Sequence, residues 1–266
     1  MALVGKKTFC VVTGASRGIG QAIATKLAET SAPESTFLLL ATNKEKLQET
    51  ADIVQENNIT VNVETVAVDF SDENLSLEGV ETAFKRLVEQ SSDIDRFIIV
   101  HNAGTTGDMN QKAIELENPE AWQSHLRINV TAMVQLNCLL YRLTNGKGKE
   151  APIFVNITSL LAIKAFPSFT QYSTSKAARE AYFRAFAAEE PNVRILSYSP
   201  GPVLTDMRSS VIETTFDAGV KAAFLEQESG DVHKQVLTPE QTVAKMLAFL
   251  DHDAYESGSR IDYFDI

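Results

Sequence analysis

Three polar residues within SLLAIKAFPSFTQYSTSK, residues 159–176, are of types that could together reduce a carbonyl group. Tyr172 follows Ser159 by thirteen residues, and Lys176 follows Tyr172 by four. A tyrosine has an ordinary pKa of about 10, and a neighbouring ammonium group such as that of Lys176 favours the phenolate and lowers this pKa. Such a tyrosine can give its proton to a carbonyl oxygen while hydride arrives from a cofactor, with Ser159 hydrogen-bonded to the same oxygen. Taken alone, a tyrosine and a lysine at this spacing equally well mark a solvated helix face.

Three glycines directly follow the first apolar run of the chain. The sequence TGASRGIG, residues 13–20, connects KTFCVVT to a stretch with apolar residues at helical spacing. Glycines let the backbone approach a pyrophosphate, whose charge is favoured at a helix N-terminus. The same glycines could form an ordinary tight turn, but their place in the first strand–helix unit favours a dinucleotide. The residues expected to bind it here are Gly14, Ser16, Arg17, Gly18, Ile19 and Gly20.

The elements around these motifs alternate between short apolar runs and amphipathic helices. Further strands are expected at 37–42, 61–68, 96–104, 152–159 and 193–201, and helices at 20–30, 119–143, 171–189 and 238–251. This alternation predicts an α/β fold with a doubly wound parallel sheet of the Rossmann type. Because the C-terminal ends of parallel strands converge on the ligand, the polar trio would lie beside a bound nicotinamide.

The chain is expected to be one catalytic unit with a lid. No composition break divides the 266 residues, so 1–266 is predicted to be a single dinucleotide-binding and catalytic domain. The segment 202–237 has no clear strand and is predicted to be an irregular substrate lid. A last β-like run, SRIDYF, follows near the C-terminus.

The composition argues against several classes of partner. A formal net charge of −11 disfavours nucleic acid and anionic membranes. Cys10 and Cys138 form neither a metal-ligand cluster nor a disulfide framework, so no metal is expected. Neither a secretory signal nor a run of eighteen apolar residues is recognisable, which predicts a cytoplasmic protein.

The end of the second expected strand, LATNKEKL at 40–47, indicates which dinucleotide is bound. An acidic residue there would bind the ribose 2′-hydroxyl of NAD, but Thr42, Asn43 and Lys44 occupy this place. Together with Arg17 they offer cationic partners for a 2′-phosphate, so NADP(H) is predicted. Lys44 could instead be a solvated lysine at a helix start.

Over nearly its whole length the chain resembles the short-chain dehydrogenase/reductase family. The resemblance rests on TGASRGIG, HNAG at 101–104, INV around Asn129, Ser159, YSTSK at 172–176 and PGPVLTDM at 200–207. His101 departs from the asparagine usual in the family. The resemblance implies that Asn129 holds a helix distortion and a water that relays protons to Lys176. The further cofactor-binding residues that it implies are Asp69, Asn102, Ala103, Gly104, Tyr172, Lys176, Pro200, Gly201, Val203 and Thr205. Asn102 could instead tie strands together, and Asp69 could cap the following helix.

Within this family, the segments 186–207 and 257–265 are similar to those of sepiapterin reductases. This resemblance implies NADPH-dependent reduction of side-chain ketones on a pterin, in tetrahydrobiopterin formation, with Ser159 and Tyr172 at the carbonyl. It also implies that Asp262 anchors the pterin, because a carboxylate accepts paired hydrogen bonds from a 2-amino-pyrimidinone edge. Asp262 could instead be a solvated carboxylate, and Met207 is a further candidate for the pocket wall. Thr42 stands where these enzymes tend to carry an arginine.

Two other functions remain open on the sequence. The chain could reduce a non-pterin ketone, aldehyde or dicarbonyl with the same trio and cofactor. Such an enzyme would differ from a pterin reductase only in the segment 202–237 and at the C-terminus. It could also be a dinucleotide-binding sensor or scaffold, although the complete polar trio argues against an idle site. The resemblance further suggests a homodimer formed by helices at 119–143 and 169–189. Their outward faces are expected to carry Met133, Leu136, Tyr182 and Phe186, which could equally be core residues.

Overall fold

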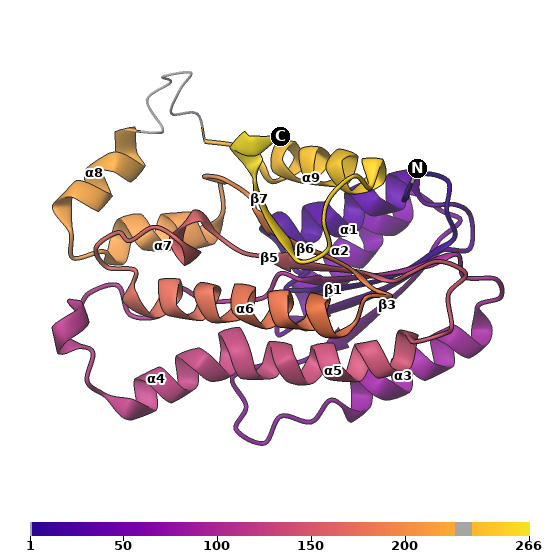
Figure 1. The fold of residues 1–266 in the computed structure, drawn as a ribbon, viewed down its shortest axis with the longest axis horizontal. Helices are drawn as coiled ribbons and strands as arrows, with labels where there is room; N and C mark the ends of the chain where they lie inside the picture. The colour runs from indigo at the N-terminus through magenta and orange to yellow at the C-terminus, as the bar shows by residue number, and fades with distance from the viewer. Residues whose placement is uncertain (1, 227–235) are drawn as a thin grey trace.

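A computed structural model describes residues 2–226 and 236–266. At its centre is a sheet of seven parallel strands in the order β3-β2-β1-β4-β5-β6-β7 (Figure 1). The strands are β1 (Thr8–Thr13), β2 (Thr36–Ala41), β3 (Asn62–Ala67), β4 (Arg96–His101), β5 (Ile153–Ile157), β6 (Arg194–Ser199) and β7 (Ser259–Asp262). The chain order reverses direction across the sheet between β1 and β4, which creates the crevice where such folds bind ligands. The predicted doubly wound α/β fold is confirmed.

Helices cover both faces of the sheet (Figure 1). One face carries α1 (Gly18–Thr30), α2 (Lys44–Asn57) and α9 (Pro239–His252), and the other carries α3 (Glu78–Gln90), α5 (Ala132–Thr144) and α6 (Thr170–Glu189). Adjacent residues of β1 show this division, because Cys10 packs with the first group of helices and Phe9 with the second. Phe9 lies 4.6 Å from Phe84 between ring centroids. Burial on both faces explains why the strands appear in the sequence as continuous apolar runs.

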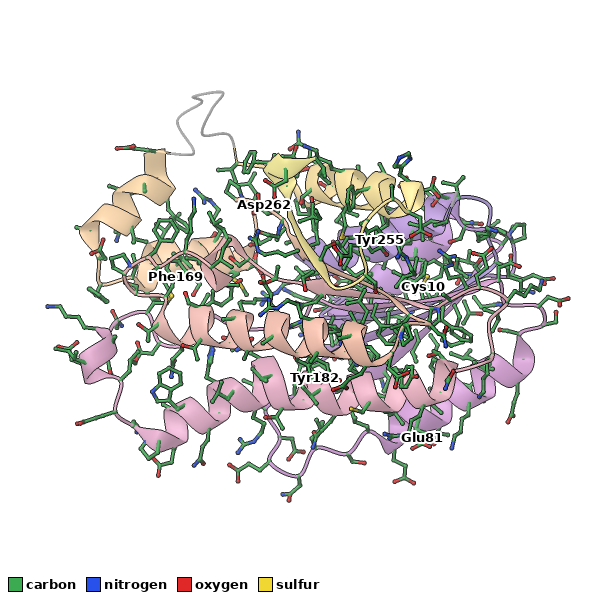
Figure 2. All side chains as sticks on the ribbon, in the orientation of Figure 1. Cys10, Glu81, Phe169, Tyr182, Tyr255 and Asp262 are labelled. Carbon is green, nitrogen blue, oxygen red and sulfur yellow. The ribbon has the colours of Figure 1, made fainter. Side chains whose placement is uncertain are left out.

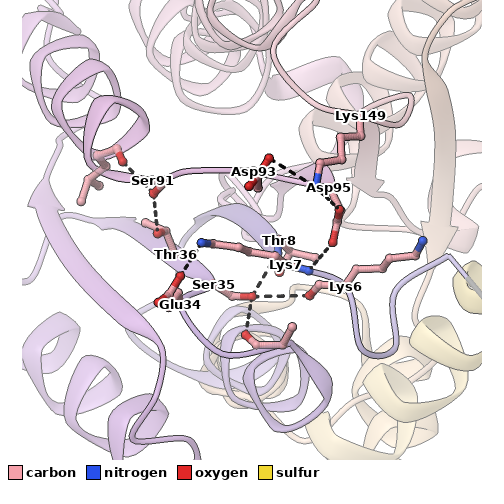
Figure 3. Close-up of polar contacts among 12 residues, drawn as sticks. Lys6, Lys7, Thr8, Glu34, Ser35, Thr36, Ser91, Asp93, Asp95 and Lys149 are labelled. Atoms are coloured by element: carbon pink, nitrogen blue, oxygen red, sulfur yellow. Dashed lines mark hydrogen bonds and ion pairs between the residues drawn. The ribbon is translucent and has the colours of Figure 1, made fainter.

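Polar contacts hold the N-terminal ends of the strands together (Figure 3). The backbone N–H of Thr8 donates to the Ser35 hydroxyl at 3.0 Å, and that of Lys7 donates to the Asp95 carboxylate at 2.9 Å. Figure 3 also shows the contact between the hydroxyls of Thr36 and Ser91. These contacts lie at the opposite end of the strands from the crevice.

Two segments differ from their predicted structure. The helix expected at 119–143 consists of α4 (Pro119–Leu126), a π-helical turn η2 (Arg127–Thr131) and α5. The segment 202–237 is not irregular throughout, since it contains α7 (Asp206–Thr214) and α8 (Ala218–Glu226). Its residues 227–235 lie outside the described residues. A β-bridge between Val203 and Leu237 holds the two ends of the segment side by side.

Most of the residues predicted for an outward dimer face belong to the core of the chain itself. Met133, Leu136 and Phe186 are buried between the sheet and its helices, and Tyr182 is partly buried beside them. The prediction of an outward face was therefore wrong for the first three, because α5 and α6 turn these side chains toward the sheet. In the described part of the chain, no helix combines the length and the apolar character needed to cross a bilayer.

Candidate active site

A cavity of about 620 Å³ lies at the C-terminal edge of the sheet. Residues from the ends of β1, β2, β4 and β5 and from the start of α6 line it, as expected for strand ends that converge at one edge. The residues predicted for the cofactor that line this cavity are Gly14, Ser16, Arg17, Gly18, Ile19, Thr42, Asp69, Asn102, Ala103, Gly104, Tyr172, Lys176, Pro200 and Thr205. Its shape and position make it the candidate dinucleotide site.

The glycine turn leaves no room for side chains. Gly14 has a φ of +63°, and a Cβ atom there would lie 2.9 Å from the side-chain nitrogen (Nδ2) of Asn102. A Cβ atom on Gly20 would lie 2.2 Å from the carbonyl oxygen of Gly14. The helix that follows begins at Gly18 with no acidic residue in its first turn and no side-chain cap from Arg17. Its free N–H groups therefore suit the pyrophosphate of a dinucleotide.

Thr13 organises the loop opposite the glycine turn, a role that the sequence analysis missed. Its hydroxyl accepts hydrogen bonds from the backbone N–H groups of Asn102 at 2.9 Å and Ala103 at 3.0 Å. The side chain of Asn102 in turn donates to the carbonyl oxygens of Thr13 and Gly14. Asn102 therefore ties two strand ends together and also lines the cavity. The position of Thr13, as the last residue of β1 before Gly14, was the available signal.

Only part of the predicted 2′-phosphate site faces the cavity. Thr42 lines it, whereas Asn43 and Lys44 do not. The Asn43 side chain accepts a hydrogen bond from Lys46 N–H and caps α2, and Lys44 is exposed in the first turn of that helix. Arg17 lines the cavity and forms an ion pair with Asp206 of α7.

Asp69 lines the same cavity. Its carboxylate accepts hydrogen bonds from the backbone N–H of Ser71 at 2.8 Å and from the Ser71 hydroxyl at 2.7 Å. These bonds lower the pKa of Asp69, the hydroxyl contributing most. The carboxylate is therefore ionised and fixed in orientation at neutral pH.

A second cavity of about 430 Å³ adjoins the first. Tyr172, Ile19 and Met207 are among the residues that line both. Ser159 and Asp262 line the second one, as do Gly201 and Val203, which had been assigned to the cofactor. Its walls are largely apolar and include four phenylalanines, Phe166, Phe169, Phe224 and Phe264. Figure 2 labels Phe169, just before α6, and Asp262, at the end of β7. This cavity is the candidate substrate pocket.

The polar trio meets where the two cavities join. Tyr172 and Lys176 lie in the first two turns of α6, and the Lys176 ammonium is 5.4 Å from the centroid of the tyrosine ring. Lys176 donates to the carbonyl oxygen of Ile157, the last residue of β5, at 2.7 Å. Ser159 follows this strand, and its hydroxyl accepts a hydrogen bond from Leu161 N–H. The end of β5 thus positions both Ser159 and Lys176.

Burial controls the pKa values of Tyr172 and Lys176. It raises the pKa of Tyr172, and a hydrogen bond with Ser159 and the positive charge of Arg179 oppose the rise. The prediction of a lowered tyrosine pKa was wrong because the side chain is almost fully enclosed. Burial also lowers the pKa of Lys176 well below its ordinary value. At neutral pH Tyr172 therefore holds its proton, which is the form that a proton donor needs.

Asn129 lies in the π-helical turn η2, so the predicted helix distortion is present. Its side chain is buried, with its oxygen accepting from Thr105 N–H at 2.9 Å and its nitrogen donating to the carbonyl oxygens of Thr105 and His125. A Cβ atom on Gly104 would lie 2.6 Å from the Asn129 oxygen. Asn129 lines neither cavity, but it holds the loop at Thr105 beside the first one.

Asp262 is almost fully buried at the end of β7. One of its carboxylate oxygens accepts a hydrogen bond from Phe264 N–H at 3.2 Å, and the other lies 3.5 Å from an Arg260 guanidinium nitrogen. The carboxylate therefore caps a short turn and is not simply solvated. An ionised carboxylate has about four lone-pair sites, so both oxygens can accept further hydrogen bonds from a ligand.

His101 is buried at the end of β4, with one ring nitrogen 2.9 Å from the Asn137 side-chain oxygen and the other without a partner among the described residues. Burial, with a contribution from Arg179, lowers its pKa to about 3. In an unfolded chain the histidine pKa is about 6.5, so below that pH the unfolded state binds a proton that the folded state does not. Stability is therefore lost as the pH falls from about 6.5 toward 3.

We expect His101→Asn to reduce this loss. Each proton bound in the unfolded state alone costs about 1.4 kcal/mol per pH unit, so His101 should remove about 2 kcal/mol between pH 8 and pH 5. Urea unfolding of both proteins at the two pH values measures the difference. The asparagine variant should lose about 2 kcal/mol less than the unsubstituted protein, and equal losses would show that His101 does not titrate in this way.

The donor set fits a nicotinamide dinucleotide and a carbonyl substrate. The glycine cradle and the open N-terminus of α1 suit a pyrophosphate, and the adjoining pocket places Tyr172 at the end of this crevice. A bound nicotinamide cofactor would supply hydride. The residues of the chain can supply a proton from Tyr172, a hydrogen bond from Ser159 and positive charge from Lys176.

Comparisons with known proteins agree with this geometry. Residues 8–215 match the family model described as short chain dehydrogenase. Sepiapterin reductase of Xenopus laevis is 33% identical over 259 residues, covering 97% of this chain and 95% of that protein, and sepiapterin reductase of Bos taurus is 32% identical over 266 residues, covering 97% and 95%. The structure of L-sorbose reductase from Gluconobacter frateurii, solved with NADPH and L-sorbose, has a TM-score of 0.78 and 27% identity, covering 98% of this chain and 97% of that one. The chain belongs to the short-chain dehydrogenase family.

Proposed function

We propose that this protein reduces a side-chain ketone of a pterin with NADPH, as in the formation of tetrahydrobiopterin. The observation that carries the proposal is the position of Tyr172 between the two cavities, with Asp262 lining the second. Similarity to sepiapterin reductases over 97% of the chain supports the pterin as substrate. The phenylalanines among the apolar residues of the pocket wall suit the flat pterin ring.

In this mechanism Asp262 binds the amino-pyrimidinone edge of the pterin and leaves the side-chain ketone near Tyr172. Ser159 donates a hydrogen bond to the ketone oxygen and orients it. Tyr172 transfers its hydroxyl proton to that oxygen as hydride reaches the carbonyl carbon. Lys176 stabilises the negative charge that develops on the tyrosine oxygen. Lys176 then passes a proton to the tyrosine oxygen, and a water held beside Asn129 returns a proton to Lys176.

NADP(H) is the proposed cofactor, and Arg17 is its proposed 2′-phosphate partner. Arg17 is exposed at the cavity, where its ion pair with Asp206 can exchange for a phosphate. Thr42 lines the same cavity and can donate a hydrogen bond to the phosphate. Lys44 is a more distant partner that would need to turn toward the cavity.

The lid and the assembly are also part of the proposal. Helices α7 and α8 form a substrate lid, since Met207, Val211, Val220 and Phe224 belong to the pocket wall. We further propose a cytoplasmic homodimer through the outer faces of α5 and α6. Val134, Tyr141 and Tyr182 are partly exposed there and supply apolar surface for such a contact.

The experiment that tests this function is NADPH oxidation by the purified protein with sepiapterin, compared with butane-2,3-dione and with NADH. We expect kcat/KM for sepiapterin to exceed that for the diketone, and NADPH to bind more tightly than NADH. A higher kcat/KM for the diketone would favour the alternative, a carbonyl reductase for non-pterin substrates. Equal affinity for the two cofactors would refute the role of Arg17. NADPH binding without turnover of either ketone would favour a sensor or scaffold.

A further inference from the structure

Arg179 is a fully buried arginine on the same face of α6 as the catalytic residues. It follows Lys176 by three residues and Tyr172 by seven, a spacing that aligns all three along one side of the helix. Arginine is seldom fully buried, and here each guanidinium nitrogen has a partner. The nitrogens donate to Asn156 Oδ1 at 2.8 Å, to Ala103 O at 3.0 Å and to His101 O at 2.6 Å.

These three acceptors belong to the framework of the cofactor cavity. His101 ends β4, and Ala103 follows it in the loop that lines the cavity. The backbone of Ala103 is held from two sides, because its N–H donates to Thr13 while its carbonyl oxygen accepts from Arg179. Asn156 lies in β5, next to the strand end that positions Lys176. Arg179 therefore fixes the catalytic helix to the cofactor loop and to β5.

The charge of Arg179 has no direct counterion. In the part of the chain that the structure describes, no carboxylate oxygen lies within 4.0 Å of its guanidinium, and its acceptors are neutral. The adjacent Glu180 instead pairs with Arg260 at 3.1 Å and accepts from the Thr158 hydroxyl at 2.7 Å. Although burial lowers the pKa of Arg179 to about 10, it stays protonated at neutral pH. A buried charge without a counterion produces a strong field in its surroundings.

We propose that Arg179 is a positioning residue of the reductase site, which holds the cofactor loop against α6 and supplies a positive field beneath Tyr172 and Lys176. This proposal rests on the proposed function. As Tyr172 gives up its proton, negative charge develops on its oxygen, and a fixed positive charge stabilises that change. The same field disfavours the charged form of Lys176. In agreement, the charge of Arg179 lowers the pKa of both residues.

Other charged and titratable groups also face this site from the surrounding elements. They are His101 in β4, His125 in α4, Glu180 in α6, Arg208 in α7, and Arg260 and Asp262 in β7. Of these groups, His101 is also affected by the charge of Arg179, which contributes to its lowered pKa, but His101 titrates on the acidic side and does not set the loss of activity at alkaline pH. A change in the pH dependence of such a variant can therefore be compared directly with the unsubstituted protein.

Two substitutions separate the charge from the hydrogen bonds. Arg179→Gln keeps two N–H donors and removes the charge. Arg179→Lys keeps the charge and loses the planar guanidinium group, which can donate in several directions at once. Arg184→Gln is the matched control, because Arg184 is exposed on the same helix. The measurements are kcat/KM against pH for ketone reduction, and the Kd of NADPH. Loss of activity at alkaline pH follows whichever of Tyr172 and Lys176 loses its proton first.

We expect Arg179→Gln to shift the alkaline limb, which is the part of the pH profile where activity falls as the pH rises, to higher pH. Removing the positive charge raises the pKa of Tyr172 and of Lys176. The same substitution should lower kcat at least about tenfold. Arg179→Lys should keep the limb of the unsubstituted protein and weaken NADPH binding about tenfold. An unmoved limb in Arg179→Gln would overturn the proposal, as would unchanged NADPH affinity in Arg179→Lys. If Arg179→Gln fails to fold, the affinity of the lysine variant still decides.

The parent reaction is measured alongside these variants. If the unsubstituted protein reduces a diketone and not sepiapterin, the proposal of a pterin substrate is refuted. The pH dependence of kcat/KM is then measured with the diketone. If it reduces neither, the NADPH affinity of Arg179→Lys still tests the positioning role. The two proposals can therefore fail independently.

Discussion

Tyr172→Phe should abolish ketone reduction while leaving NADPH binding almost unchanged. The substitution removes the hydroxyl that donates the proton and keeps the ring, which packs beside Phe169 with centroids 6.1 Å apart. General acid catalysis contributes about 10²–10⁴-fold to a rate, so kcat should fall by at least about 10²-fold. The Kd of NADPH should change little, because the cavity owes its shape to the glycine turn and the loop at Asn102.

Tyr182→Phe provides a matched control for this experiment. Tyr182 is in the same helix, and its hydroxyl accepts a hydrogen bond from the Asn137 side chain instead of lining either cavity. Its loss should cost about 1 kcal/mol of stability and leave kcat within experimental error. NADPH oxidation under single-turnover conditions separates chemistry from product release. If Tyr172→Phe kept the kcat of the unsubstituted protein, another group would have to be the proton donor.

Asp262→Ala should distinguish a pterin pocket from a general ketone pocket. The carboxylate is the group expected to accept two hydrogen bonds from the pterin, each of which is worth about 1.5–3 kcal/mol when the acceptor is charged. We therefore expect kcat/KM for sepiapterin to fall by at least about 10²-fold. Reduction of butane-2,3-dione, which has no such edge, should change little. The measurement is kcat/KM for each substrate with saturating NADPH.

Asp265→Ala controls for the structural role of Asp262. The two residues form the capping box of the C-terminal turn, in which Asp262 N–H donates to the Asp265 carboxylate at 3.0 Å. Asp265 is exposed and does not line the pocket, so its substitution weakens the turn without removing the anchor. Equal losses for both substrates in Asp262→Ala would argue against a pterin anchor, as would an equal loss of sepiapterin turnover in Asp265→Ala.

The sequence was most informative about the fold, for a physical reason. Strands buried on both faces appear as apolar runs, and helices packed on one side show helical periodicity, so each element carries its own local signal. This local sequence signal is weaker where tertiary packing, and not periodicity, determines the structure. The π-helical turn around Asn129 was expected only from the family resemblance, because the hydrogen bonds of Asn129 with Thr105 and His125 leave no periodic pattern in the sequence. Helices α7 and α8 are short, and their amphipathic pattern is correspondingly brief.

For the site, position along the strands carried most of the prediction. Ser159, Tyr172 and Asp262 come together because the ends of β5 and β7 and the start of α6 lie at one edge of the sheet. Side-chain direction was not readable from the sequence, so Lys44 was expected at the cavity but lies outside it. The side chain of Arg179 donates to three acceptors, in β4, in the loop that follows it and in β5, and no local sequence pattern reveals these contacts.

The central claim is that Tyr172 and a nicotinamide cofactor together reduce a pterin side-chain ketone. Its most direct test is to follow deuterium from NADPH labelled at the transferring position of the nicotinamide into the product formed from sepiapterin. Mass spectrometry and NMR locate the label. We predict one deuterium on the former carbonyl carbon of the side chain, at a rate that Tyr172→Phe lowers by at least about 10²-fold. A pterin product without deuterium at that carbon, or no pterin product at all, would contradict the claim.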